Sequence, residues 1–181
     1  MILRCSLIGV LAAISLTVPP ALPADPSEWG PITDGLRMSV ARPSGILVRE
    51  LRITIENVGE APVVLQIGTT NNVEEYLGFV LHFGTLDGQE QTFTLLPRLM
   101  ISAGYSGPLM IQLRPGRSYT RTTSLAKWNN WDSLEGVNLD VVAAASQLSI
   151  ELTSRGCGER TPKDYQCWTG TLVSNTLRLP Q

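Results

Sequence analysis

Histidine is almost missing from this chain, and charge of either sign is sparse. Its 181 residues include one histidine and three cysteines, and 17% are charged, with a formal net charge of −2. Nucleic-acid-binding domains carry a basic patch, so this balance argues against a nucleic-acid partner. Catalytic triads and zinc sites both draw on histidine, and one imidazole offers little for either. We therefore expect no enzyme activity, no catalytic residues, and no metal or other cofactor.

Hydrophobic runs are also too short to cross a membrane. The apolar run Leu7–Val18 covers about 12 residues, whereas a membrane-spanning helix needs roughly 20. It lies within residues 1–24, after the single charge of Arg4 and before a segment of proline and small residues. This order is typical of a secretory signal peptide with cleavage after Ala24, the alternative being an uncleaved anchor. The prediction is a secreted or periplasmic protein with no membrane span after cleavage.

Cysteine is scarce too, and cleavage would remove Arg4 and Cys5. The mature chain would keep 13 basic and 16 acidic residues, a net charge of −3, and two cysteines, Cys157 and Cys167. Outside the cytoplasm such a pair is expected to form a disulfide, a metal site or a reactive thiol being the alternatives. The residues between them, GERTPKDYQ, are polar and predict an exposed loop. Closing a loop of this size contributes roughly 2–3 kcal/mol.

Alternation of apolar and polar side chains runs through much of the mature chain and predicts β-strands. Residues 125–135 and 140–145 depart from it, and we expect at most one or two short helical turns there. No long amphipathic helix separates the strands, which favours an all-β, antiparallel sandwich or barrel of about eight to nine strands. The predicted strands lie within 36–41, 51–56, 63–67, 79–83, 92–95, 109–113, 148–153 and 168–179.

Turn residues mark the breaks between these strands. Asp87-Gly88 predicts a type I′ hairpin, and Pro115-Gly116 suits the two central positions of a type II turn. In the last segment, Leu172 and Leu177 have opposite parity and would face opposite sides of an unbroken strand. We therefore predict a bulge or a sheet switch near Ser174-Asn175, which would return both leucines to one face.

Three motifs follow one another along the chain: N-x-G-x-x-P-V at Asn57 to Val63, LRPGRSYT at 113–120, and W-x-G-x-x-x-S-N at Trp168 to Asn175. Together they resemble secreted bacterial immunoglobulin-like β-sandwich domains, over most of residues 29–180. The resemblance implies an immunoglobulin-like sandwich outside the cytoplasm and transfers no catalytic residues. With a length suited to one domain, the chain is expected to divide into a signal peptide (1–24), a lead-in arm (25–34) and the sandwich (35–181).

Candidate binding residues are few. Trp128 and Trp131 lie three residues apart, so one helical turn would place both indoles on one side, where they could stack on a glycan or anchor a protein. The other interpretation is that they plug one end of the sandwich. Arg160 and Lys163 lie between the paired cysteines and are candidate contact residues of an extracellular protease inhibitor.

The one histidine, His82, has opposite parity to the apolar residues of its strand and is expected to face outward or to pack at a sheet edge. No catalytic role is expected for it. The sequence therefore favours a secreted, non-catalytic binding or structural module. A protease inhibitor that uses the disulfide-closed loop, and a carbohydrate-binding module that uses the tryptophans, are the alternatives. Its expected partner is a protein or a glycan.

Overall fold

The computed structural model describes residues 28–43, 50–71, 73–75, 78–85, 88–95, 107–129, 136–137, 139–157 and 161–179. The all-β class expected from the sequence is confirmed. The predicted signal peptide, 1–24, and the beginning of the lead-in arm lie outside the described residues. None of the helices in the described part is long and apolar enough to cross a membrane.

The strands differ widely in length, and the described helical structure between the first and the last strand is a 3₁₀ turn and one short α-helix. The 3₁₀ turn is Leu125–Lys127 and the helix is α1 (Leu139–Ala144), so both segments that departed from alternation contain a helical turn. The strands are β1 (Leu36–Ala41), β2 (Glu50–Asn57), β3 (Val63–Asn71), β4 (Val73–Glu75), β5 (Phe79–Thr85), β6 (Glu90–Leu95), β7 (Gly107–Leu113), β8 (Ser118–Ser124), β9 (Trp128–Asn129), β10 (Ala145–Ser154), β11 (Gln166–Cys167), β12 (Gly170–Val173) and β13 (Leu177–Arg178).

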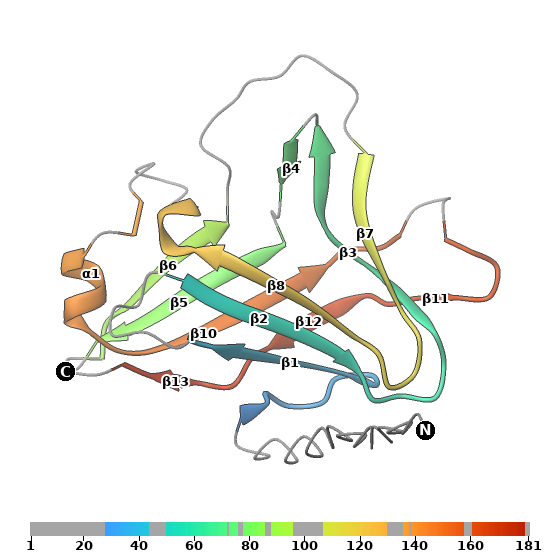
Figure 1. Cartoon of the computed structure of the whole chain (residues 1–181), viewed down its shortest axis with the longest axis horizontal. Helices are drawn as coiled ribbons and strands as arrows, with labels where there is room; N and C mark the ends of the chain where they lie inside the picture. Colours follow the sequence, from blue (N-terminus) through green and yellow to red (C-terminus); the bar gives the residue numbers. More distant parts are fainter. Residues whose placement is uncertain are drawn as a thin grey trace, which may run out of the picture.

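Three sheets are formed from these strands. The first sheet has the order β1-β2-β8, and the second has the order β12-β10-β5-β6-β9, with β13 also paired to β10. The first sheet crosses in front of the second (Figure 1), an arrangement compatible with a β-sandwich. In the third sheet, β3 pairs with β7, β4 and β11, and its pairing with β11 is parallel. This third sheet rises beside the two layers and places β3 next to the end of β10 (Figure 1).

The core lies between the first two sheets, on the side chains that alternation placed inward. On β1 and β2 the buried residues face one another in register, as Met38 opposite Ile55 and Val40 opposite Ile53. Phe83 and Phe93 of the second sheet pack edge to face, with ring centroids 5.8 Å apart. Each such side chain contributes about 1.5–3 kcal/mol on burial, so the core is the main source of stability.

Strand β8 was not predicted. Every second residue of SYTRTTS, namely Tyr119, Arg121 and Thr123, is more buried than its neighbours, but none of them is aliphatic. The hydrophobic alternation that reveals the other long strands is therefore missing. Continuous pairing with β2, from Glu50 opposite Ser124 to Glu56 opposite Ser118, holds β8 in the sheet.

The bulge predicted near Ser174-Asn175 is confirmed. Val173 pairs with Glu151, whereas Leu177 pairs with Leu148, so one extra residue has entered the register between β12 and β13. The hydroxyl of Ser174 bridges the break, because the backbone N–H of Ile150 donates to its Oγ (2.9 Å). The shift returns Leu177 to the core side of β10, in agreement with its packing against the core.

Asn175 then joins the first sheet to the second. Its Oδ1 accepts a hydrogen bond from the backbone N–H of Val40 (2.7 Å), and its Nδ2 donates to the Val40 carbonyl (3.2 Å). The amide thus pairs with β1 as another strand would. Gly30 of the lead-in arm packs at the same seam, where a Cβ would lie 2.0 Å from the carbonyl oxygen of Val173.

The turn after Asn57 and the turn at Pro115-Gly116 meet at one corner, around Asn57, which is 1% exposed. Its Oδ1 accepts from the N–H of Gly59 (2.9 Å), and its Nδ2 donates to the carbonyls of Ala61 (2.8 Å) and Leu113 (3.0 Å). In the neighbouring turn, Gly116 has a φ of 70°. This positive φ fits the predicted type II turn.

The hairpin between β5 and β6 is confirmed, but its predicted turn type was wrong. The N–H of Gly88 donates to the carbonyl of Thr85 (3.1 Å), and the N–H of Thr85 donates to the carbonyl of Gln89 (2.9 Å). Gly88, with a φ of 81°, therefore stands at the end of the turn and not at its centre. A longer connection with a left-handed residue before the second strand is the usual alternative to type I′.

Candidate functional site

A groove of about 620 Å³ lies between β3 and the outer face of the second sheet. Its volume is in the range of small-molecule and peptide-fragment sites, roughly 300–1,000 Å³. One wall comes from β3, and the floor comes from outward-facing residues of β5, β6 and β10. The described lining residues are Gln66, Gly68, Thr69, Gly78, Val80, Thr94, Glu151, Thr153 and Arg155.

Strand periodicity explains why polar side chains line this floor. In β5 the residues Phe79 and Leu81 point into the core, so Val80 between them points outward. Glu151 and Thr153 of β10 have the same outward parity, since Leu152 is buried. The floor is therefore one continuous sheet face, held rigidly by the core beneath it.

Gly78 lets the chain lie close to β10 at the end of the groove. A Cβ at this position would lie 2.9 Å from Cδ1 of Leu152 and 3.1 Å from the carbonyl oxygen of Thr153. The carbonyl of Gly78 accepts a hydrogen bond from the N–H of Thr153 (3.0 Å). A larger residue would push these two segments apart and widen the floor.

The charges of the groove balance. Among the described lining residues, Glu151 has the one negative charge and Arg155 the one positive charge. The hydroxyl of Thr153 contacts Oε1 of Glu151 at 3.4 Å and shares a hydrogen bond of 3.2 Å with the hydroxyl of Thr171. The groove thus offers hydroxyl, amide and charged groups beside the apolar Val80, which suits a ligand held by hydrogen bonds and a small apolar contact.

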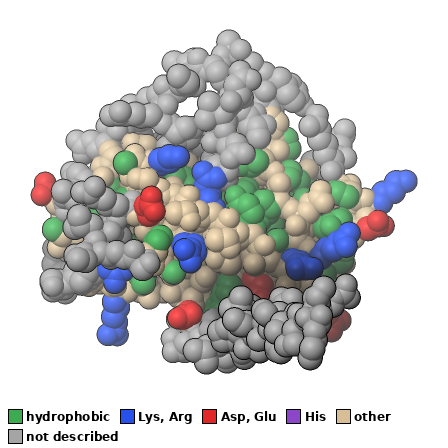
Figure 2. Space-filling view, in the orientation of Figure 1, with side chains coloured by type: hydrophobic (Ala, Val, Ile, Leu, Met, Phe, Trp, Pro, Cys, Tyr) green, Lys and Arg blue, Asp and Glu red, His purple; other side chains and the backbone are tan. Residues whose placement is uncertain are grey.

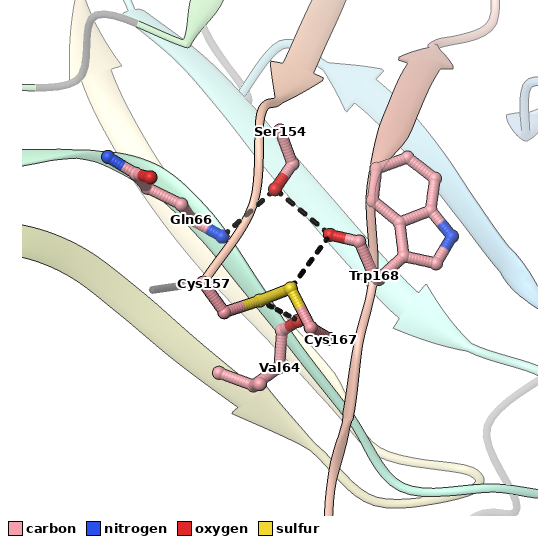
Figure 3. The surroundings of a disulfide bond; sticks show 6 residues. All are labelled: Val64, Gln66, Ser154, Cys157, Cys167 and Trp168. Atoms are coloured by element: carbon pink, nitrogen blue, oxygen red, sulfur yellow. Dashed lines mark hydrogen bonds between the residues drawn. A yellow bond between two sulfur atoms is a disulfide. The ribbon is translucent and has the colours of Figure 1, made fainter. Parts of the chain in front are cut away.

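The wall and the floor meet at the buried hydroxyl of Ser154 (Figure 3). Its Oγ accepts a hydrogen bond from the backbone N–H of Gln66 (3.1 Å) and donates to the carbonyl of Trp168 (3.2 Å). Ser154 is 2% exposed, and its two partners come from β3 and from the segment after β11. One side chain therefore ties three segments together at the end of the groove.

The predicted Cys157–Cys167 disulfide is confirmed and lies beside this junction (Figure 3). Sγ of Cys157 lies 3.2 Å from the carbonyl oxygen of Val64 on β3. A disulfide sulfur has no hydrogen to donate, so this is a close contact and not a hydrogen bond. The disulfide therefore connects β10, β11 and the wall strand, where the sequence had suggested only a closed surface loop.

Trp128 does not have the position expected of a binding residue. It is 0% exposed, belongs to β9 opposite Leu95, and packs in the core. No indole face is left for a sugar ring, so its proposed role in glycan stacking was wrong, and the interpretation as a core plug fits its burial. The helical turn expected to align it with Trp131 ends at Lys127, and Trp131 lies outside the described residues.

The loop proposed for protease inhibition is described only in part, since Arg160 lies outside the described residues. Lys163 is exposed within a turn closed by the N–H of Tyr165 and the carbonyl of Pro162 (3.0 Å). The Tyr165 hydroxyl accepts a hydrogen bond from Nε of Arg114 (3.4 Å), which raises the pKa of that guanidinium. Strand-like peptide recognition needs an extended backbone, which this turn does not offer at Lys163.

His82 faces outward, as its parity predicted. Its Nδ1 contacts the carboxylate of Glu90, and its Nε2 lies 4.0 Å from Oε2 of Glu151. Ser149 is its cross-strand neighbour on β10, yet Nε2 of His82 has no hydrogen-bond partner within the described residues. The hydrogen bond between nucleophile and base that serine catalysis uses is therefore not formed here. Within the described ranges, no three histidine, cysteine, aspartate or glutamate side chains gather to hold a metal ion.

The groove residues were not singled out from the sequence. Thr94, Glu151 and Thr153 are outward positions of strands, and such positions read as an ordinary solvated face. Their role appears only when β3 lies across that face. Comparison with protein-family models, curated proteins and solved structures finds no match to the chain.

Proposed function

We propose that this protein is a non-catalytic binding module that holds its ligand in the groove between β3 and the second sheet. The observation that carries the proposal is the groove itself, about 620 Å³ in volume and lined by polar side chains fixed on strands. Sites built on strands keep their geometry better than sites built on loops, because the core restrains the backbone. The ligand class that suits such a lining is a peptide or a glycan segment.

The proposal includes a location outside the cytoplasm and an immunoglobulin-like architecture. Residues 1–24 have the order of a signal peptide, and the disulfide is compatible with an oxidising compartment. The stacked antiparallel sheets are compatible with the sandwich that the motif resemblance to bacterial immunoglobulin-like domains implies. These three features together support a secreted or periplasmic module of that class.

A non-catalytic role fits the surroundings of the histidine. His82 contacts Glu90 and lies near Glu151, so two carboxylates flank the imidazole on a sheet face. Nε2 of His82 has no hydrogen-bond partner within the described residues. The chemistry at this face supports binding better than group transfer.

Two matched substitutions test the proposal on glycan and peptide arrays. Thr94→Arg would fill the groove with a long side chain, whereas Thr122→Arg places the same change on the outer face of the first sheet. Figure 2 shows that face, where charged side chains of both signs are scattered over the described part. Thr122 is exposed in the middle of β8, so the control alters charge and size without touching the groove.

The expected result is an array ligand that binds wild-type protein and Thr122→Arg equally and fails to bind Thr94→Arg. Binding that survives Thr94→Arg would place the ligand elsewhere and contradict the groove. Failure of wild-type protein to bind any glycan or peptide would count against the binding role as a whole. Circular dichroism of both variants, compared with wild type, confirms that the fold is retained.

A further inference from the structure

We infer that the Cys157–Cys167 disulfide is a redox-sensitive brace of the groove, and that the core of the first two sheets stays folded without it. The inference rests on the proposed function, because it assigns a control to the same site. The disulfide joins the segment just after β10, a strand that forms part of the groove floor, to β11, which is attached to the wall strand β3. Both sides of the groove therefore meet through one covalent bond.

Strand β11 has few other attachments to the wall. Its parallel pairing covers only Gln166 opposite Val63 and Cys167 opposite Val64. The N–H of Gln166 donates to the Pro62 carbonyl (2.9 Å), and the N–H of Trp168 donates to the Val64 carbonyl (2.8 Å). Two paired residues form a marginal strand, so the disulfide is a main restraint on Gln166 and Cys167, whereas Trp168 after them is also held by its burial in the core.

The junction at Ser154 transmits that restraint to the groove. Gln66, a lining residue, donates its backbone N–H to Ser154, and Ser154 donates to the carbonyl of Trp168, which follows the bonded Cys167. Ser154 lies directly between two other lining residues, Thr153 and Arg155. Release of β11 would remove one of the two partners that fix the Ser154 hydroxyl and would loosen the wall at Gln66.

Most of the core is held by other contacts, and from this segment it includes the side chain of Trp168, which is 4% exposed. β10 pairs with β5 along Leu148 to Leu152, and with β12 and β13 on its other side. Leu148, Ile150 and Leu152 are at most 1% exposed and precede the disulfide in the chain, within β10 itself. Opening the disulfide therefore leaves the apolar contacts that stabilise the two layers.

The redox step needs an external dithiol reductant. Its thiolate attacks Sγ of Cys167, which belongs to an exposed residue, whereas Cys157 is 2% exposed. The S–S bond breaks, Cys157 leaves as a thiolate and takes up a proton, and a mixed disulfide forms at Cys167. The second thiol of the reductant then displaces Cys167, which takes up the other proton. The dithiol is oxidised to its cyclic disulfide, and the protein disulfide is reduced to two thiols.

The reduced Cys157 would remain close to β3. Its Sγ lies 3.2 Å from the Val64 carbonyl, and a thiol at this place has the hydrogen that the disulfide sulfur lacks. Reduction therefore frees β11 and its neighbours while the end of β10 keeps a contact with the wall. The expected change is local loosening and not unfolding.

Amide hydrogen exchange measured by NMR tests this inference on the full mature chain. Oxidised wild type is compared with wild type in a dithiol reductant and with Cys157→Ser/Cys167→Ser. The amides of Gln66, Gln166 and Trp168 are expected to exchange roughly 10- to 100-fold faster without the disulfide, since loop closure of this size is lost. The core amide of Ile150 is expected to keep its rate. Adding reductant to the double-serine variant is the matched control, and it should change nothing.

Three results would overturn the inference. Unchanged exchange at Gln66 would mean that the disulfide does not brace the wall. Equal acceleration at Ile150, or failure of the double-serine variant to fold, would mean that the disulfide holds the whole fold. Equal affinity of oxidised and reduced protein for a groove ligand found on the arrays would also overturn it, and would leave the proposed function intact. If oxidised protein binds no array ligand, the exchange experiment still decides the brace by itself.

Discussion

Replacing Asn57 by alanine is expected to destabilise the fold by about 3 kcal/mol. The side chain is 1% exposed and makes three hydrogen bonds, one from Gly59 and two to the carbonyls of Ala61 and Leu113. A typical bond of this kind contributes about 1 kcal/mol net, and a buried group left without a partner costs at least as much. For a domain of about 150 residues, this loss corresponds to a Tm lower by roughly 6–12 °C.

Urea denaturation followed by tryptophan fluorescence measures the effect. Asn57→Asp keeps the acceptor for Gly59 but turns a carboxylate toward the two carbonyls, so it should cost more than alanine. Gln147→Ala, on an exposed position of β10, is the control and should stay within about 0.5 kcal/mol of wild type. If Asn57→Ala is as stable as this control, or if the aspartate variant matches wild type, the hydrogen-bond reasoning is refuted.

Three smaller predictions concern other contacts. Asn175→Ala should cost about 1–2 kcal/mol, because it removes both hydrogen bonds to Val40. The amide of Val40 should then exchange faster with solvent. An unchanged exchange rate at Val40 would mean that Asn175 does not hold β1 to the second sheet. Trp128→Ala should lower the free energy of unfolding by about 3–5 kcal/mol, and Trp128→Phe by less, because the indole is fully buried. Calorimetry measures both losses, and two equal, small losses would contradict this prediction. Arg37→Ala should cost about 1–2 kcal/mol, since it removes the stacking of the guanidinium on Trp29, 4.2 Å from the ring centroid, and a partly exposed ion pair with Glu56 that contributes at most about 1 kcal/mol. A double-mutant cycle with Glu56→Ala measures that pair, and coupling well above this value would count against the estimate.

Particular elements show how far sequence reasoning reached. The strands with aliphatic alternation, such as β2 and β10, were predicted because period-two burial is local information. The bulge at Ser174-Asn175 was predicted for the same reason, since the parity of Leu172 and Leu177 conflicts within one strand. β8 was missed because its more buried face carries Tyr119, Arg121 and Thr123, none of which is aliphatic. β11 was missed because a strand of two residues is too short to show a periodic pattern.

The candidate site was much less predictable. The spacing of Trp128 and Trp131 left open both an exposed binding pair and a plug of the sandwich, and only the structure shows that Trp128 is buried, through β9. The sequence did not indicate a binding role for the groove residues. An outward threonine on a solvated sheet face has the same sequence pattern whether or not another strand lies across that face. Spatial neighbours from distant segments, such as Gln66 and Ser154, leave no spacing in the sequence that could reveal them.

What the sequence by itself determined is the all-β class, the inward and outward faces of the longer strands, and the pairing of Cys157 with Cys167. These follow from period-two hydrophobicity and from the scarcity of cysteine, both of which are properties of neighbouring residues or simple counts. Only the tertiary structure decided where β3 lies, and with it the groove, the Ser154 junction and the place of the disulfide beside the groove wall. The physical reason is that contacts between segments far apart depend on how sheets stack, and stacking is an outcome of the whole core.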